Sequence, residues 1–275
     1  GERTHPPVVP DLLDRRDDAR AIVTRAAAGR SASSALADET VPGAARADLA
    51  RRLGVLLATV HGAPPAGAAA HHTYRAADEL RELEGYLDAA WQADPAAAVS
   101  LRWLTTDLAA ATPVAGDLRF AHGSYRAGQI VVGPRGGLTL LDLDGVGLAD
   151  PARDLGHAMA HLDWQYLRTG AGPFAADLVD GYRSARGAVD DGTLAWWRAA
   201  ALAKIAGRRY RSLDTATWAE VPALMRLGSE VLALGSRTSA SGVRGRAADV
   251  VDPARMTAVL APLIGDGPAG DGTTQ

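Results

Sequence analysis

The sequence predicts an α+β protein that is mostly helical, with a small β-hairpin near its middle. A length of 275 residues allows a large buried core, and 47% hydrophobic against 22% charged residues is the balance of a globular protein. Apolar residues recur at helical spacing over long stretches, as at Leu49, Leu53 and Leu56. Two short apolar runs flank the glycine-rich turn 133–137, which predicts the hairpin.

The composition argues against several classes of function. A formal charge of −3 gives no reason to expect nucleic acid or a membrane surface as a partner. The chain has no cysteine, which excludes disulfides and thiolate metal sites. No apolar run approaches the roughly 18–20 residues of a membrane span. The start of the chain has no secretion signal, so the cytoplasm is the expected location.

The first part of the chain, residues 1–35, predicts extended structure. Apolar runs at 8–13 and 21–24 flank a charged turn, which is consistent with a hairpin. Residues 36–264 are predicted to form a mostly helical unit. The polar, glycine-rich tail 265–275 is expected to be disordered.

Helices are predicted on both sides of the central hairpin. Before it, one helix spans about 44–60, a second follows, and a third opens at Asp94-Pro95, a cap residue followed by proline. After it, the chain is predicted to be helical from 151 to about 234. A glycine- and serine-rich link at 235–245 then leads to a last helix opened by Asp252-Pro253. Breaks in the long helical stretch are expected near Gly170, Gly187 and Gly207.

The centre of the chain carries its only chemical signature. A short strand at 118–121 leads into a polar loop from His122 to Gln129, and strands 130–132 and 138–141 then form the hairpin. The second of these strands runs into Asp142-Leu143-Asp144-Gly145. The hairpin therefore places two polar loops side by side. This layout suits phosphoryl transfer, which depends mostly on positioning and charge neutralisation.

These two loops resemble those of the aminoglycoside-phosphotransferase and choline-kinase-like family. In that family the first loop reads H-G-D-x-x-x-x-N. The second has an aspartate between hydrophobic residues, followed by G-D-P-x-x-D-L. The corresponding residues here are His122-Gly123-Ser124-Tyr125-Arg126-Ala127-Gly128-Gln129, Leu141-Asp142-Leu143-Asp144-Gly145 and Ala149-Asp150-Pro151-Ala152-Arg153-Asp154-Leu155. Order, spacing and the intervening hairpin match, and the resemblance covers about residues 8–234.

The resemblance implies a protein-kinase-like fold with a mostly helical C-terminal lobe, and ATP and Mg²⁺ as the cofactors of an active member. The hairpin then lies at the catalytic and metal loops. Residues 1–35 correspond to only a remnant of the N-terminal β-lobe and its hinge. No glycine-rich loop precedes this remnant. The only lysine, Lys204, lies on a late helix, far from the position of the family's phosphate-binding lysine.

The resemblance also assigns the catalytic positions. Ser124 falls where the family has its catalytic aspartate, and His122 and Arg126 are further candidates in the same loop. Serine is neutral at pH 7 and is no general base without a partner. A Ser124–His122 hydrolase pair has no supporting G-x-S-x-G motif. Asp154 is interpreted as a brace for the His122 loop, and Asp150 before Pro151 as a helix cap.

The nucleotide and metal positions are also partly altered. Gln129 falls on the family's metal-binding asparagine and is one methylene longer, so that position is weakened. Asp142 falls on the metal-binding aspartate and is kept. Both are candidates for nucleotide and metal binding. Asp144 is either a further metal ligand or a solvated neighbour. His157 and His161 share a helix face with Asp154, but nothing else completes a metal site there.

These departures favour a pseudokinase, a degenerate member that acts as a ligand- or partner-binding accessory module. The C-terminal lobe would keep a pocket for a small molecule or peptide whose identity the sequence does not disclose. The strands of a truncated N-terminal lobe would expose apolar surface to a protein partner or a second copy. The basic cluster of Arg208, Arg209 and Arg211 has two interpretations, a surface for an anionic partner and a solvated helix face, and the second is favoured.

The alternative is an active ATP-dependent phosphotransferase that acts on the hydroxyl of a small molecule or peptide. It would need another carboxylate, such as Asp144 or Asp117, to orient the acceptor hydroxyl in place of the missing aspartate.

Overall fold

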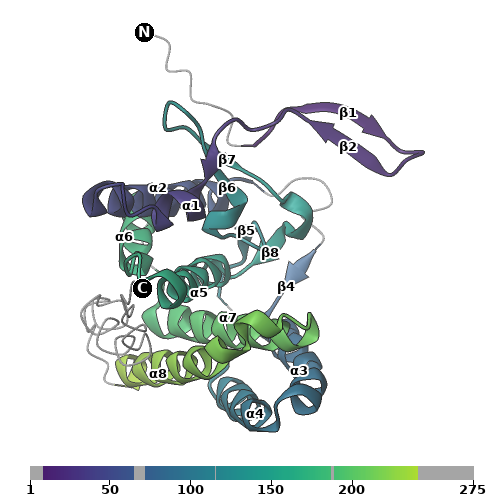
Figure 1. The fold of residues 1–275 in the computed structure, drawn as a ribbon, viewed down its shortest axis with the longest axis vertical. Helices are drawn as coiled ribbons and strands as arrows, with labels where there is room; N and C mark the ends of the chain where they lie inside the picture. The colour runs from purple at the N-terminus through teal and green to yellow at the C-terminus, as the bar shows by residue number, and fades with distance from the viewer. Residues whose placement is uncertain (1–8, 65–71, 115, 187–188, 241–275) are drawn as a thin grey trace, which may run out of the picture.

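The structure, a computed structural model, describes residues 9–64, 72–114, 116–186 and 189–240. These residues are mostly helical and carry three small β-sheets, as the α+β class requires (Figure 1). The α-helices are α1 (Ala32–Ala37), α2 (Gly43–His61), α3 (Ala76–Ala93), α4 (Pro95–Ala110), α5 (Pro151–Thr169), α6 (Ala175–Arg186), α7 (Asp191–Arg211) and α8 (Val221–Ala240). Short 3₁₀ turns occur at Ala127–Gln129, Leu143–Gly145 and Thr215–Glu220.

Of the three sheets, the second and third bring the polar loops together. In the first sheet, β1 (Leu12–Arg16) pairs antiparallel with β2 (Ala21–Thr24). In the second, β6 (Ile130–Val132) pairs antiparallel with both β3 (Arg30–Ser31) and β7 (Leu138–Leu140). In the third, β8 (Gly147–Ala149) lies between β4 (Thr73–Tyr74), which is parallel to it, and β5 (Arg119–Ala121), which is antiparallel. The register pairs Ala121 with Gly147, so the loop after β5 meets the loop before β8.

Helix α7 forms the centre of the helical part. It packs on α5, α3 and α8, and Figure 1 shows it running between α5 and α8. Trp196 and Trp197 are both buried in this core, as expected for packing residues. Arg198 donates from Nε and Nη2 to the two carboxylate oxygens of Asp163, at 2.8 and 2.7 Å, and both residues are buried. This two-pronged ion pair satisfies both buried charges and fixes α7 against α5.

Glycines allow α2 and α6 to approach closely. A Cβ atom on Gly54 of α2 would overlap the carbonyl oxygen of Leu178 on α6. A Cβ atom on Gly181 of α6 would overlap the carbonyl oxygen of Arg51 on α2. The two helices therefore contact backbone to backbone, and this contact holds α2 in place beneath the polar loops.

The structure confirms several sequence-based expectations for the elements. The central hairpin forms at the expected strands. Asp94 caps α4 by accepting from the amides of Ala96 and Ala97. Gly170 ends α5 in the left-handed conformation, with φ of 67°. The N-terminal hairpin also forms, although β1 extends to Arg16 and so includes part of the stretch expected to be the turn.

Two expectations about glycine are wrong. Gly207 does not break the helix but lies inside α7, where an added Cβ would sit 2.7 Å from Cβ of Tyr86 on α3. The chain instead leaves α7 after Arg211, and Leu213 adopts φ of 54°. Gly235 does not begin a link, because α8 continues to Ala240. Gly187, the helix expected at Asp252-Pro253 and the tail 265–275 lie outside the described residues.

The β1–β2 hairpin extends away from the helical body (Figure 1). All residues of both strands are exposed, including Leu12 and Ile22 at 62% and 67%. Among the helices of the described residues, none is both long enough and apolar enough to cross a membrane.

Candidate functional site

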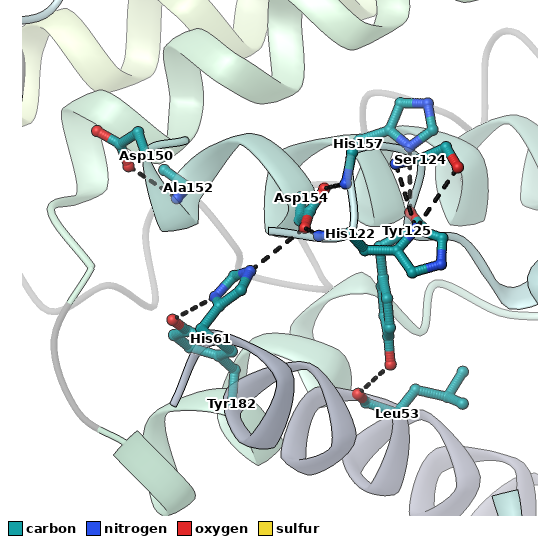
Figure 2. Close-up of polar contacts among 11 residues, drawn as sticks. Leu53, His61, His122, Ser124, Tyr125, Asp150, Ala152, Asp154, His157 and Tyr182 are labelled. Atoms are coloured by element: carbon teal, nitrogen blue, oxygen red, sulfur yellow. Dashed lines mark hydrogen bonds and ion pairs between the residues drawn. The ribbon is translucent and has the colours of Figure 1, made fainter. Parts of the chain in front are cut away.

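A buried aspartate on α5 holds the first polar loop. Asp154 is fully buried, and its Oδ2 and Oδ1 accept hydrogen bonds from the backbone amides of His122 and Gly123, at 2.6 and 2.9 Å (Figure 2). His61 Nε2, at the end of α2, lies 3.4 Å from Oδ2. Burial would raise the pKa of Asp154, but the hydrogen bond and charge of His61 together hold it below its ordinary value. The predicted role of Asp154 as a brace is confirmed.

His122 joins the first loop to the second. Its Nε2 lies 2.9 Å from the carbonyl oxygen of Leu141, and since a carbonyl only accepts, Nε2 carries the proton. The other ring nitrogen, Nδ1, then accepts from the amide of Ser124 at 3.3 Å. His122 is completely buried. It therefore has a structural role that spans the two loops, and its two ring nitrogens are both engaged in holding them.

Ser124 lies at the centre of the first loop and is partly buried. Its Oγ is 3.5 Å from Nδ1 of His122, a long contact. Asp117 precedes β5 and Ser124 follows it, so the rise of this strand, about 10 Å, lies between the two residues along the chain. Asp144 is better placed, since a Cβ on Gly123 would overlap the carbonyl oxygen of Gly145 and the two loops therefore touch. The structure records no hydrogen bond or ion pair for Asp144 within the described chain.

Gln129 and Asp142 meet at the open end of the hairpin. The side-chain amide nitrogen of Gln129 donates to Oδ2 of Asp142, and the amide of Leu141 donates to the carbonyl oxygen of Gln129 at 2.8 Å. Asp142 is exposed and adopts a left-handed backbone conformation, with φ of 62° and ψ of 65°. A non-glycine residue held in this region carries strain, which tends to occur at functional sites. The structure thus brings the two predicted nucleotide and metal residues into direct contact.

Arg126 lies beside a pocket of 130 Å³. The side chain of Arg126 is half-buried. The pocket lies between the first loop, α1 and α5, and its lining includes Ser33, Arg126, His161, Trp164, Gln165 and Arg168. Sequence patterns do not predict this pocket, because its walls come from three segments that are far apart along the chain.

The two histidines of α5 do not form a metal site with Asp154. His157 Nδ1 donates to the carbonyl oxygen of Tyr125 at 3.1 Å, and the rings of His157 and His161 are 4.7 Å apart. Burial lowers the pKa of His157 to about 4. Among the described residues, no group of three or more histidine, aspartate and glutamate side chains is arranged to hold a metal ion.

Several residues that hold the site were not found from the sequence. Tyr125 is fully buried and donates from its hydroxyl to the carbonyl oxygen of Leu53 on α2, at 2.6 Å. His61 contacts Tyr182 at 2.9 Å through Nδ1 as well as Asp154 through Nε2. A single histidine at the end of an amphipathic helix carries no sequence signal for such a role. The amino group of Lys204, in contrast, forms ion pairs with Glu82 and Glu79, at 2.5 and 3.2 Å.

Comparison with known proteins finds one matching sequence family. The sequence model of the phosphotransferase enzyme family matches residues 3–197. No curated protein sequence matches the chain.

Solved structures of small-molecule kinases share the fold. A glucosamine kinase has 18% identity and a TM-score of 0.53, with 85% of this chain and 66% of that chain covered. A choline/ethanolamine kinase family protein from Mesorhizobium loti has 17% identity and a TM-score of 0.50, covering 90% and 78%. The choline kinase LicA from Streptococcus pneumoniae has 14% identity and a TM-score of 0.50, covering 85% and 75%.

Proposed function

Because the chain belongs to the phosphotransferase enzyme family, we propose that it is a pseudokinase which keeps that family's ligand pocket but has lost phosphate transfer. It would act as an accessory module that binds a small molecule or peptide beside the first loop. The observation that carries the proposal is the side chain at the centre of that loop, which is the neutral hydroxyl of Ser124 and not a carboxylate.

The two buried titratable groups that hold the first loop are not available as the missing base. His122 is buried, and its protonated nitrogen is committed to Leu141. Asp154 is a buried carboxylate that contacts the loop, but its two oxygens already accept hydrogen bonds from the backbone amides of His122 and Gly123. General-base assistance is worth about 10²–10⁴ in rate, so its loss alone makes transfer slow.

The residues at the nucleotide and metal positions also support a pseudokinase, although their side chains are of a type that can bind a metal. Magnesium prefers oxygen ligands, and Asp142 and the side-chain oxygen of Gln129 are of that kind, with Asp144 exposed beside them. These residues would hold Mg²⁺, which neutralises phosphate charge when it is bound with ATP. In the structure, however, Gln129 presents its nitrogen to Asp142, and this hydrogen bond competes with metal binding.

The second candidate is an active ATP-dependent phosphotransferase acting on a hydroxyl of a small molecule or peptide. The left-handed backbone of Asp142 favours an active enzyme. Asp142 is exposed, so packing does not explain this strained conformation, and such strain is common at functional sites. In this case Asp144 would orient the acceptor hydroxyl.

Calorimetric titration with ATP and Mg²⁺ separates the two candidates. The pseudokinase predicts no binding or only millimolar affinity, and no ATP turnover with hydroxylated substrates. Micromolar affinity together with turnover that is lost in Asp142→Ala would overturn it. Asp107→Ala, on the exposed face of α4, is the matched control and should behave as the wild type does in both assays.

A further inference from the structure

We propose that the pocket beside the first loop binds an anionic group, the phosphate or carboxylate of a small molecule, and that Arg126 is the residue that recognises it. This inference rests on the proposed ligand-binding function and names the chemical class of the ligand.

The lining of the pocket carries positive charge and no negative charge. Arg126 lies on one wall and Arg168 on another, and the remaining polar lining comes from neutral side chains: Ser33, His161, Trp164, Gln165 and Thr169. A volume of 130 Å³ holds several water molecules, which is space for a phosphate or carboxylate group with a few further atoms. No aspartate or glutamate lines the pocket, so the lining offers a cationic ligand no carboxylate to pair with.

Arg126 is a half-buried guanidinium whose charge is not neutralised. The described chain provides no ion pair or hydrogen bond for its side chain. Other arginines near the pocket are paired: Arg168 lies 3.2 Å from Glu220, and Arg209 lies 2.9 Å from Asp214. No side-chain nitrogen of Arg126 is a buried atom without a partner, so its guanidinium is accessible to solvent and to a ligand. The planar fork of arginine matches phosphate and carboxylate geometry.

The two paired arginines both contact the ring of Trp164. Arg168 lies 5.2 Å and Arg209 4.7 Å from the centre of the Trp164 ring, close enough for cation–π contacts. The indole nitrogen of Trp164 donates to Glu220. The carboxylate of Glu220 is therefore bound to Trp164 and Arg168, and it has no ion pair with Arg126.

The pKa of His161 is lowered by burial and also by basic neighbours. Burial is the largest cause of its lowered pKa, followed by the charges of His157, Arg126, Arg208 and Arg209. All of these neighbours are basic. The expectation that the basic cluster of α7 is a solvated helix face is wrong for Arg209, which is half-buried against Trp164. It holds for Arg208 and Arg211, which are exposed, although Arg211 also lies 4.7 Å from the ring centre of Tyr86.

A matched series of sugars tests the proposal, because its members differ mainly in charge. The probes are glucose, glucosamine, gluconate and glucose 6-phosphate, titrated while the imidazole of His161 is followed by NMR. Its signals are assigned by comparison with His161→Gln. We expect saturable shifts with glucose 6-phosphate or gluconate, and these two arms show whether phosphate or carboxylate is preferred. Glucose and glucosamine should leave the signals unchanged.

Variants locate the anion. Arg126→Gln should weaken anion binding about tenfold or more, the value of one charge-assisted hydrogen bond, while Arg126→Lys should restore part of it. Arg102→Gln, an exposed arginine of α4, should bind as the wild type does. In Arg126→Gln without ligand, the His161 pKa should rise, because a positive neighbour has been removed.

The outcomes separate this inference from the proposed function. If glucosamine binds at His161 and neither anion does, the anionic assignment is overturned while a ligand-binding role stands. If anions bind equally well to Arg126→Gln, Arg126 is not the recognition residue and the proposal falls. If no probe shifts His161, the result counts against both.

Discussion

A single side chain separates this chain from the expectation of its family. Ser124 provides a hydroxyl where proton transfer would need a carboxylate, and His122, whose ring it contacts, is buried and holds the loops together. The serine is therefore expected to take no part in chemistry. The residue that remains free to act on a ligand in this loop is Arg126.

We predict that Ser124→Ala leaves both ATP turnover and esterase activity at the wild-type level, because Ser124 moves no proton. Ser124→Asp is the complementary variant, and it should raise any residual ATP turnover by at most about 10²–10⁴. Steady-state assays of ATP hydrolysis and of an activated ester measure both. A tenfold loss of either activity in Ser124→Ala would mean that the serine is catalytic after all.

The pH dependence of stability should depend on His157. Burial lowers its pKa in the folded protein to about 4, from an ordinary value of 6.5, so the unfolded chain takes up the proton first as pH falls. The free energy of unfolding is thus greatest above about pH 6.5 and falls as pH drops towards 4. His157→Gln, which does not titrate in this range, should reduce this fall.

Urea unfolding at a series of pH values measures the effect of His157→Gln. The slope should shrink without vanishing, because the pKa of His161 is also lowered and that residue remains. His72→Gln, at an exposed histidine, is the control and should keep the wild-type slope. A wild-type slope in His157→Gln would show that the histidine is not buried as described.

At the scale of the elements, close backbone contact explains why some glycines lie inside helices. Gly181 of α6 would place a Cβ atom on the carbonyl oxygen of Arg51, and a backbone group cannot turn away as a side chain can. We therefore predict that Gly181→Ala destabilises the protein by about 1–3 kcal/mol or more, through separation of α2 from α6.

Gly85 offers the opposite case on α3. A Cβ atom there would meet nothing within 4 Å, so Gly85→Ala should stabilise the protein by about 0.4–1 kcal/mol by restricting the unfolded chain. Thermal and urea unfolding of both variants checks the pair. Equal effects of the two substitutions would contradict the packing described for α2 and α6.

Local patterns predicted the helices, their caps and the central hairpin, but not the contacts between distant segments. Asp94 could be predicted as a cap because cap and proline are neighbours in sequence. The strands β3, β4 and β8 have only two or three residues each and exist through pairing with distant partners. Gly207 was misread as a break, since its reason for being glycine is Tyr86 on another helix.

The same limit applies to the site. Motif spacing predicted that the 122–129 loop meets Asp142, and it does. It also predicted the bracing role of Asp154. The contact of His61 with Asp154 joins residues 93 positions apart, and the charge of the pocket combines Arg126 of the first loop with Arg168 of α5. Such features follow from packing, which one sequence does not display.

At the scale of the whole molecule, the β1–β2 hairpin is an exposed surface that is suited to bind a partner. Within the described residues, each of its strands pairs only with the other, which leaves two open edges. Its apolar side chains Leu12, Leu13, Ile22 and Val23 are all exposed, and an exposed apolar strand with free edges tends to associate. Self-association through this hairpin is therefore a proposal that follows from its surface.

We predict that the protein forms oligomers as its concentration rises, and that the double variant Leu12→Ser and Ile22→Ser shifts it towards the monomer. Sedimentation equilibrium over a range of concentrations measures both. Trp103→Ser is the matched control, because Trp103 on α4 is as exposed as Ile22, at 67%, but lies on a helix without free backbone groups to pair. If the control dissociates the oligomer as well as the double variant does, general stickiness and not strand pairing drives association. A wild type that stays monomeric at every concentration would contradict self-association, and the hairpin would then bind a different protein. In that case the double variant should lose this partner but keep anion binding at Arg126.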